Sequence, residues 1–205
     1  MNLEELIGKT MERLCVPEAQ GVPQMLARFL GELEKWNRRV NLVGVKDVER
    51  VCRELMADAF FLNHYLKDRH HIVDIGSGSG ILGIPIAVLN GSITVYSVDG
   101  NLKKVQFQRH IRRELGLANF FPIRGRTEMI DPLGADGLIA KAFGTTESIL
   151  DAAERHLGVS GKVFIVKGKD GQGKDHPRYR LEKELSYMLP DVEKTYRLFI
   201  YKKVS

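Results

Sequence analysis

The chain has 205 residues, with 31 Lys and Arg against 26 Asp and Glu, which gives a formal charge of +5. With 43% hydrophobic and 28% charged residues, it has a globular composition rather than that of a disordered or collagen-like chain. No apolar run is long enough to cross a bilayer, and no signal-peptide pattern is present. The two cysteines, Cys15 and Cys52, are too few for a disulfide scaffold and too far apart in the sequence for a metal pair. We therefore expect a cytoplasmic protein that has neither a membrane nor a metal as a partner.

The first 66 residues have helical periodicity and predict a helical cap. Asn2 is placed to cap a first helix, and Asp47 is placed to cap a third. Between them, over residues 18–40, apolar side chains recur at helical spacings and predict a stripe of core residues. These side chains are Met25, Phe29, Leu33 and Trp36.

The pattern changes at residue 71, where short apolar runs begin to alternate with helical stretches. The runs predicted to be strands are 72–75, 93–98, 120–123, 138–142, 163–166 and 196–201, and the helices are 81–89, 101–116 and about 146–157. Such alternation builds a doubly wound, mostly parallel sheet with helices on both faces. For the last run, an antiparallel insertion is the alternative to a helical crossover. The predicted organisation is a cap, residues 1–66, on an α/β domain, residues 67–205.

The clearest motif is a glycine-rich loop between the first predicted strand and the next helix. Three alternating glycines, Gly76, Gly78 and Gly80, follow Asp74 at the end of the strand. Ligands of open parallel sheets bind beyond the carboxyl ends of the strands, and glycines let the backbone approach them closely. The sequence therefore predicts a small-molecule site at this loop.

Two kinds of cofactor are compatible with the loop. The segment from Gly78 to Gly83 has the G-x-G-x-x-G spacing of dinucleotide-binding proteins, which alone is a weak signal. The frame D-x-G-x-G-x-G that begins at Asp74 is that of class I S-adenosylmethionine methyltransferases, whose cofactor has an ammonium group and no pyrophosphate. Asp99, at the end of the next strand, is placed to accept the ribose hydroxyls of either cofactor. Asp74 and the lack of a second catalytic domain favour S-adenosyl-L-methionine over a nicotinamide cofactor.

Further motifs extend over nearly the whole chain. They are Trp36-Asn37, Asn41-Leu42, the segments Val73 to Pro85, Lys103 to Phe107 and Glu114 to Asn119, then Arg126-Thr127-Glu128, Ala142-Phe143 and Val166-Lys167-Gly168. By their order and spacing the chain resembles the bacterial 16S rRNA guanine-N7 methyltransferases, the small-subunit methyltransferase G or glucose-inhibited division protein B family. The resemblance implies a class I methyltransferase fold, S-adenosyl-L-methionine as cofactor, and small-subunit ribosomal RNA, free or in a particle, as partner.

Cofactor-binding residues follow from the loop frame and from the resemblance. They are Asp74, Gly76, Ser77, Gly78, Gly80, Ile81, Asp99, Thr127, Glu128 and Lys141. Lys141 replaces an arginine that is usual in the family, and so keeps the charge but loses the bidentate fork. Two other departures lie near the expected substrate side: Val43 in place of a threonine, and a His-x-x-Asp-Ser pattern replaced around Glu54 and Asp58.

Methyl transfer to guanine N7 needs no general base, because this nitrogen has a free lone pair at neutral pH. Positioning alone contributes a large part of such a rate. The stretch Ala-Lys-Ala-Phe stands where methyltransferases of exocyclic amines carry Asp/Asn-Pro-Pro-aromatic, and no cysteine lies in the predicted α/β domain. These absences favour an acceptor that is already nucleophilic, and we predict no catalytic acid or base.

Basic residues gather in later segments that could converge on one RNA-binding face. Residues 100–126 hold seven cations against one anion, and residues 35–53 hold six against two. The predicted RNA contacts are Arg109, Arg112 and Arg113, on the polar face of one helix, and Lys167 and Lys169 beside a glycine-rich loop. Phe143 is a weaker candidate for stacking on a base. A methyltransferase for another RNA or a small molecule, and a non-catalytic RNA-binding relative, are the alternatives.

Overall fold

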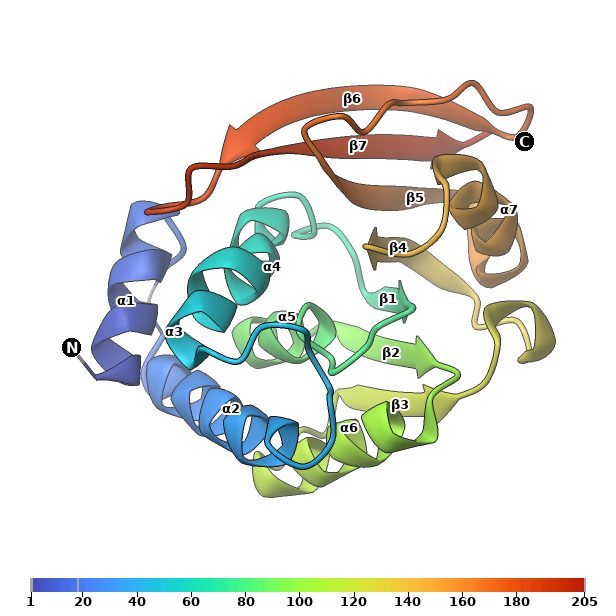
Figure 1. Cartoon of the computed structure of the whole chain (residues 1–205). Coiled ribbons are helices and arrows are strands. Elements are labelled where there is room, and N and C mark those ends of the chain that lie inside the picture. The colour runs from blue at the N-terminus through green and yellow to red at the C-terminus, as the bar shows by residue number, and fades with distance from the viewer. Residues whose placement is uncertain (1, 18, 205) are drawn as a thin grey trace.

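A seven-stranded sheet forms the centre of the molecule (Figure 1). The computed structural model describes residues 2–17 and 19–204. The strands are β1 (His71–Ile75), β2 (Thr94–Asp99), β3 (Phe120–Arg124), β4 (Ala135–Lys141), β5 (Leu157–Gly168), β6 (Tyr179–Met188) and β7 (Thr195–Lys203). Their order is β3-β2-β1-β4-β5-β7-β6, with β1 to β5 parallel and β7 antiparallel between β5 and β6. The strand order reverses between β1 and β4, which places a switch point at their carboxyl ends.

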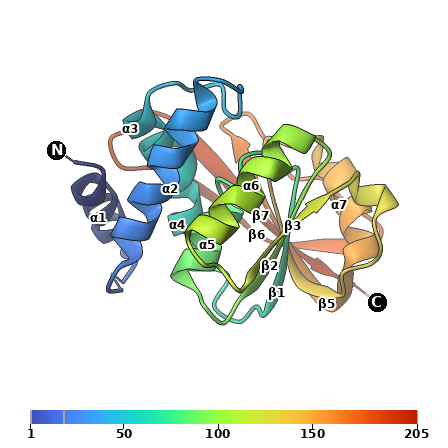
Figure 2. The same cartoon turned by 90° about the horizontal axis from the view of Figure 1, so that it is seen from below.

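Helices cover both faces of the sheet (Figure 2). They are α1 (Leu3–Arg13), α2 (Val22–Asn37), α3 (Val48–Val51), α4 (Ala57–Asn63), α5 (Gly83–Leu89), α6 (Leu102–Glu114) and α7 (Thr146–His156), with a π-helical turn η1 (Cys52–Met56) and a 3-10 turn η2 (Thr127–Met129). Alternate residues of β1 point to opposite faces. Val73 and Ile75 join the core beneath α7, whereas Ile72 joins the core beneath α2, α5 and α6.

The N-terminal helices share a core with the α/β part of the chain. Leu26 and Phe29 of α2 are fully buried in the same cluster as Phe107 of α6. The rings of Phe29 and Phe107 lie 6.1 Å apart, within the range of favourable aromatic pairs. The cap therefore extends the helical layer on one face of the sheet.

Most of the predicted elements are present. Asn2 forms a capping box with Glu5, and the Asp47 carboxylate accepts the amides of Glu49 and Arg50, as predicted. The strand expected at 196–201 is the antiparallel insertion, β7. The prediction was incomplete at two places: η1 interrupts the helix that begins after Asp47, and β6 was not predicted because only two of its side chains are buried.

Among the described residues, no helix is long and apolar enough to span a membrane. The same residues contain no group of three or more His, Cys, Asp or Glu side chains arranged to hold a metal ion.

Candidate functional site

The loop after β1 has the backbone conformation that its glycines predict. The φ angles of Gly76, Gly78 and Gly80 are +61°, +61° and +78°, a region that side chains disfavour. At Gly76 a Cβ atom would also collide with the ring of Phe143. Gln108 of α6 holds the loop from the other side, because its side-chain amide donates to Ser77 Oγ at 2.9 Å and to the Gly78 carbonyl at 2.7 Å. The loop is therefore rigidly placed at the switch point.

Asp99, at the carboxyl end of β2, is fixed by two backbone amides. Its Oδ2 accepts from Gly78 at 2.8 Å, and its Oδ1 accepts from Asn101 at 2.7 Å. Each carboxylate oxygen keeps further acceptor capacity. The side of Asp99 away from the core borders a hollow of about 390 Å³, which we call the Asp99 hollow. This volume lies within the range of small-molecule sites.

The Asp99 hollow is lined by residues at or after the carboxyl ends of β1, β2, β3 and β4. In that order they are Gly76, then Val98, Asp99, Gly100 and Lys104 of α6, then Gly125, Arg126, Thr127 and Glu128, and then Ala142 and Phe143. The structure thus brings together the predicted residues Gly76, Asp99, Thr127 and Glu128. Lys104 and Arg126 were not predicted as site residues, although both lie within motifs that carry the family resemblance.

The turn that carries Thr127 and Glu128 is anchored to α7. The Nε2 of buried His156 contacts the Thr127 carbonyl at 2.8 Å, and the Arg155 Nε donates to the Ile130 carbonyl at 2.8 Å. Burial lowers the pKa of His156, which favours the neutral ring with its proton on Nε2. The turn therefore has a fixed position at the rim of the Asp99 hollow.

Asp74 lies beneath the loop and is not one of the residues that line the hollow. It points to the same face of β1 as Ile72, is 2% exposed, and accepts the Gly83 amide at 3.1 Å on Oδ2. Burial raises the pKa of Asp74 to about 8, against the lowering effect of the Gly83 hydrogen bond, and the nearby Asp99 raises it further. In this position Asp74 supports the loop from inside, and its contact with a cofactor stays a prediction.

Lys141, the last residue of β4, belongs to a buried cluster of polar groups with residues of η1 and α4. Its ammonium forms an ion pair with Asp58, which is fully buried, and donates to the carbonyls of Glu54 and Leu55 in η1 at 3.3 and 3.4 Å. Tyr187 of β6 donates to the other Asp58 oxygen at 2.6 Å. The cluster ties β4, η1 and β6 together, and Lys141 does not line the Asp99 hollow.

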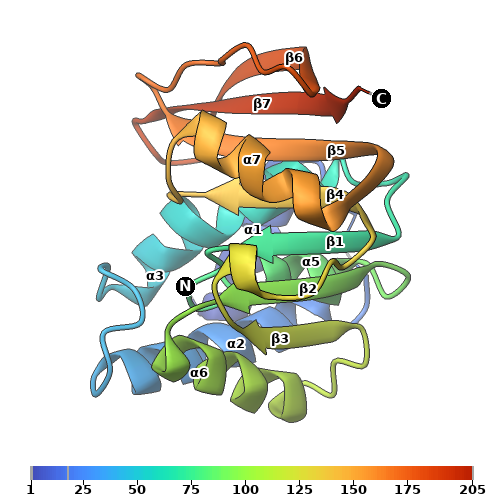
Figure 3. The same ribbon diagram turned by 90° about the vertical axis from the view of Figure 1, so that its right-hand side faces the viewer.

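The predicted RNA contacts do not converge on one face. Helix α6 runs back from the carboxyl end of β2 to the amino end of β3, so Arg109, Arg112 and Arg113 line a hollow near the amino edge of the sheet (Figure 3). Lys167 and Lys169 lie at the carboxyl end of β5. Lys167 donates to the Gly144 carbonyl at 2.7 Å, and burial lowers its pKa. Two separate basic groups thus take the place of the single face that the charge pattern suggested.

Solved structures with a similar arrangement are methyltransferases. A SAM-dependent methyltransferase from Aquifex aeolicus has a TM-score of 0.59 and 14% identity, over 85% of this chain and 98% of that one. TYW2 from M. jannaschii, solved in complex with AdoMet, has a TM-score of 0.56 and 15% identity, over 73% of this chain and 74% of that one. The chain therefore has the fold of S-adenosylmethionine-dependent methyltransferases.

Sequence comparison narrows this class to a family. Residues 23–193 match the family model described as rRNA small subunit methyltransferase G. The ribosomal RNA small subunit methyltransferase G of Legionella pneumophila (strain Lens) is 30% identical over 186 residues, which cover 89% of this chain and 88% of that relative. The chain belongs to the rRNA small subunit methyltransferase G family and is an rRNA methyltransferase, which confirms the resemblance of the motifs.

Replacing Asp74 by Asn tests the effect of burying this carboxyl. The folded-state pKa of about 8 exceeds the ordinary value of 3.8, so Asp74 stabilises the fold fully below about pH 4 and loses that contribution as the pH rises through 8. Between pH 6 and 8 the unfolding free energy of the wild type should fall by about 2 kcal/mol relative to Asp74→Asn, whose amide oxygen still accepts from Gly83. Denaturant unfolding at several pH values measures this, and parallel curves for the two proteins would contradict the assignment.

Replacing Lys141 by Met tests the buried ion pair. The substitution leaves the Asp58 carboxylate without a counter-charge and should lower the unfolding free energy by about 3–5 kcal/mol. Adding Asp58→Asn should restore much of that loss, since an amide carries no charge and still accepts from Tyr187. Lys141→Arg is the matched control that retains the charge. A single Lys141→Met variant as stable as the wild type would show that the pair does not stabilise the fold.

Proposed function

We propose that the Asp99 hollow binds S-adenosyl-L-methionine and that the enzyme transfers its methyl group to N7 of a guanine in small-subunit ribosomal RNA. The observation that carries the choice of cofactor is the hydrogen bonding of the glycine loop. The amides of Ser77, Gly78 and Gly80 donate to Val98, Asp99 and Ser77. A pyrophosphate group binds to backbone amides that have no other hydrogen-bond acceptor, and these three amides already donate within the protein. The loop therefore favours a cofactor without pyrophosphate.

Asp99 suits the nucleoside part of this cofactor. Its two oxygens are held apart and oriented by the amides of Gly78 and Asn101, and their remaining lone pairs match two neighbouring ribose hydroxyls. The close contact of Gly76 with Phe143 leaves no room for a side chain in the loop. The turn at Thr127 and Glu128, anchored by His156, lines the same hollow, and from the family resemblance we expect the adenine near its backbone.

The role of the protein in the reaction is to position the reactants. When bound, S-adenosyl-L-methionine supplies a methyl group on a positively charged sulfur, which keeps the electron pair of the broken bond while N7 forms the new bond with its own lone pair. Since N7 carries no proton, no residue has to remove one, and we assign no catalytic acid or base. The rigid loop, Asp99 and the anchored η2 turn fix one reactant, and well-oriented reactants account for a large part of the rate.

Titration with S-adenosylhomocysteine, the product form of the cofactor, tests the proposal directly. Calorimetry of the wild type should show binding of this compound and no binding of NADH. Asp99→Asn should weaken the affinity about 10- to 100-fold, because a charged acceptor of hydrogen bonds is lost. Binding of NADH alone would overturn the assignment of the cofactor.

The reaction itself is tested by methyl transfer to small-subunit ribosomal RNA. Incubation with labelled cofactor, followed by nuclease digestion and mass spectrometry of the nucleosides, should show 7-methylguanosine. Methylation of another nucleoside would retain the cofactor and refute the guanine N7 assignment.

A pair of glycine variants separates the effect of the loop on cofactor binding from the cost of a positive φ angle. Gly76 and Gly134 both have positive φ, +61° and +58°, but only Gly76 faces another side chain, that of Phe143. Gly134→Ala should lose about 1–2 kcal/mol of stability from the left-handed conformation, and Gly76→Ala should lose more, because its Cβ also collides with Phe143. Gly76→Ala should also weaken S-adenosylhomocysteine binding at least tenfold, whereas Gly134→Ala should not. Equal affinities for the two variants would show that the loop does not contact the cofactor.

A further inference from the structure

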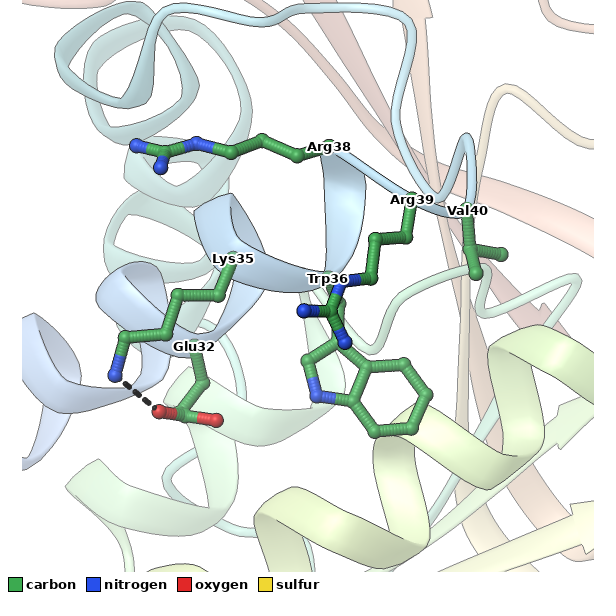
Figure 4. Close-up of a pocket in the computed structure, with 6 residues that line it drawn as sticks. All are labelled: Glu32, Lys35, Trp36, Arg38, Arg39 and Val40. Carbon is green, nitrogen blue, oxygen red and sulfur yellow. Dashed lines mark hydrogen bonds and ion pairs between the residues drawn. The ribbon is translucent and has the colours of Figure 1, made fainter.

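A second hollow, of about 500 Å³, lies at the C-terminal end of α2 (Figure 4). We call it the Trp36 hollow, and it is lined by Glu32, Lys35, Trp36, Arg38, Arg39 and Val40. The sequence predicted Trp36 as a core residue, but the structure leaves it half-buried. Its ring packs at 5.5 Å against Phe107 and at 5.4 Å against His110 of α6, and its remaining surface borders the hollow.

The lining of the Trp36 hollow has more cations than acids, since Lys35, Arg38 and Arg39 stand against Glu32. Residues 35–46 include four cations and no acid. Lys35 and Arg38 form ion pairs with Glu32 and Glu34, but their side chains are 70% and 71% exposed, and such pairs contribute little. Within the part of the chain that the structure describes, the Arg39 side chain has no ion pair or hydrogen bond. Figure 4 shows Arg39 extending toward Trp36.

Asn37 gives this basic segment a defined conformation. Its Oδ1 accepts the amides of Leu42 and Val43 at 2.8 and 3.0 Å, and its Nδ2 donates to the Val45 carbonyl at 3.2 Å. Leu42 is buried and anchors the segment in the core. The cations after Asn37 are therefore presented on an ordered loop next to an aromatic face.

The Trp36 hollow opens beside the loop that follows α2, because Arg38, Arg39 and Val40 line it. The loop after α2 lies on the side toward which the parallel strands point (Figure 3). Helix α6 connects the two hollows, because Lys104 lines one and His110 packs on Trp36 beside the other. These two residues are six positions apart, which is a rise of about 9 Å along the helix.

We propose that the Trp36 hollow binds a single-stranded nucleotide of the RNA substrate close to the one that is methylated, with its base on the indole of Trp36 and its phosphate at Arg39. The inference rests on the proposed function and deepens it. Unpaired bases stack on aromatic side chains, and arginines neutralise the adjoining phosphates. An A-form duplex keeps its bases stacked inside the helix and offers none to Trp36. The expected partner is therefore an unpaired segment.

Trp36 is the one tryptophan of the chain, so its fluorescence reports this contact without any label. Addition of a ten-nucleotide oligouridylate to the protein loaded with S-adenosylhomocysteine should quench the emission in a saturable way. A duplex RNA of equal length should not. Arg39→Gln should weaken the binding of the oligonucleotide about tenfold and lower the slope of log affinity against log salt by about one. Arg180→Gln, which removes an exposed charge on the outer strand β6, is the matched control and should change neither value.

Methyl transfer to small-subunit ribosomal RNA provides the second readout. Trp36→Leu keeps apolar packing against Phe107 but removes the stacking face, and should raise the KM for RNA about 5- to 100-fold. Trp36→Phe retains a ring and should recover most of that loss. The affinity for S-adenosylhomocysteine, measured by calorimetry, should be the same in both variants, which controls for misfolding.

The outcomes separate this inference from the proposed function. If a labelled oligonucleotide binds without quenching Trp36, or if the duplex quenches as well as the single strand, the inference is wrong. Equal effects of Arg39→Gln and Arg180→Gln, or of Trp36→Leu and Trp36→Phe, also overturn it. A wild-type enzyme that transfers no methyl group to ribosomal RNA refutes the proposed function, whatever the fluorescence shows.

Discussion

The arrangement of the site depends on one carboxylate, that of Asp99. It joins the amide of Gly78 in the first loop to the amide of Asn101, whose own side chain caps α6 by accepting the amides of Lys103 and Lys104. Helix α6 in turn returns to the first loop through Gln108. This closed circuit of hydrogen bonds fixes the glycine loop relative to the second strand. It also uses the amides of Ser77, Gly78 and Gly80 internally.

The same circuit explains how one glycine pattern can serve two classes of cofactor. Glycines allow the positive φ angles and let the backbone approach a ligand closely, but the hydrogen-bond partners of the loop amides decide which ligand fits. In this chain the amides of Ser77 and Gly80 turn to protein carbonyls, at Val98 and Ser77. The spacing of the glycines alone could not distinguish these alternatives, because both spacings occur in the same ten residues, 74–83.

Much of the fold could be predicted from the sequence, because caps, periodicity and strand–helix alternation are local signals. What could not be predicted depends on contacts distant in sequence: the ion pair of Lys141 with Asp58, the edge strand β6, and the π-helical turn η1 whose carbonyls receive Lys141. The positions of two other predicted residues were within reach of the sequence. Strand alternation already places Asp74 on the face of Ile72, and a crossover helix must run back against its strands, which carries Arg113 away from the cofactor edge.

The direction of the crossover helices limits where RNA can bind. A nucleotide that receives a methyl group has to reach the carboxyl edge of the sheet, since the proposed cofactor site lies there. Cations at the end of a crossover helix lie at the opposite edge from that site. Cations that begin such a helix, end a strand, or follow a helix that runs toward this edge lie on the same side as the site. In this chain these are Lys104, Lys169 and Arg39, from three segments far apart in sequence. We therefore infer that strand direction decides which cations lie near the nucleotide that is methylated, and RNA contacts of Arg109, Arg112 and Arg113 stay a prediction.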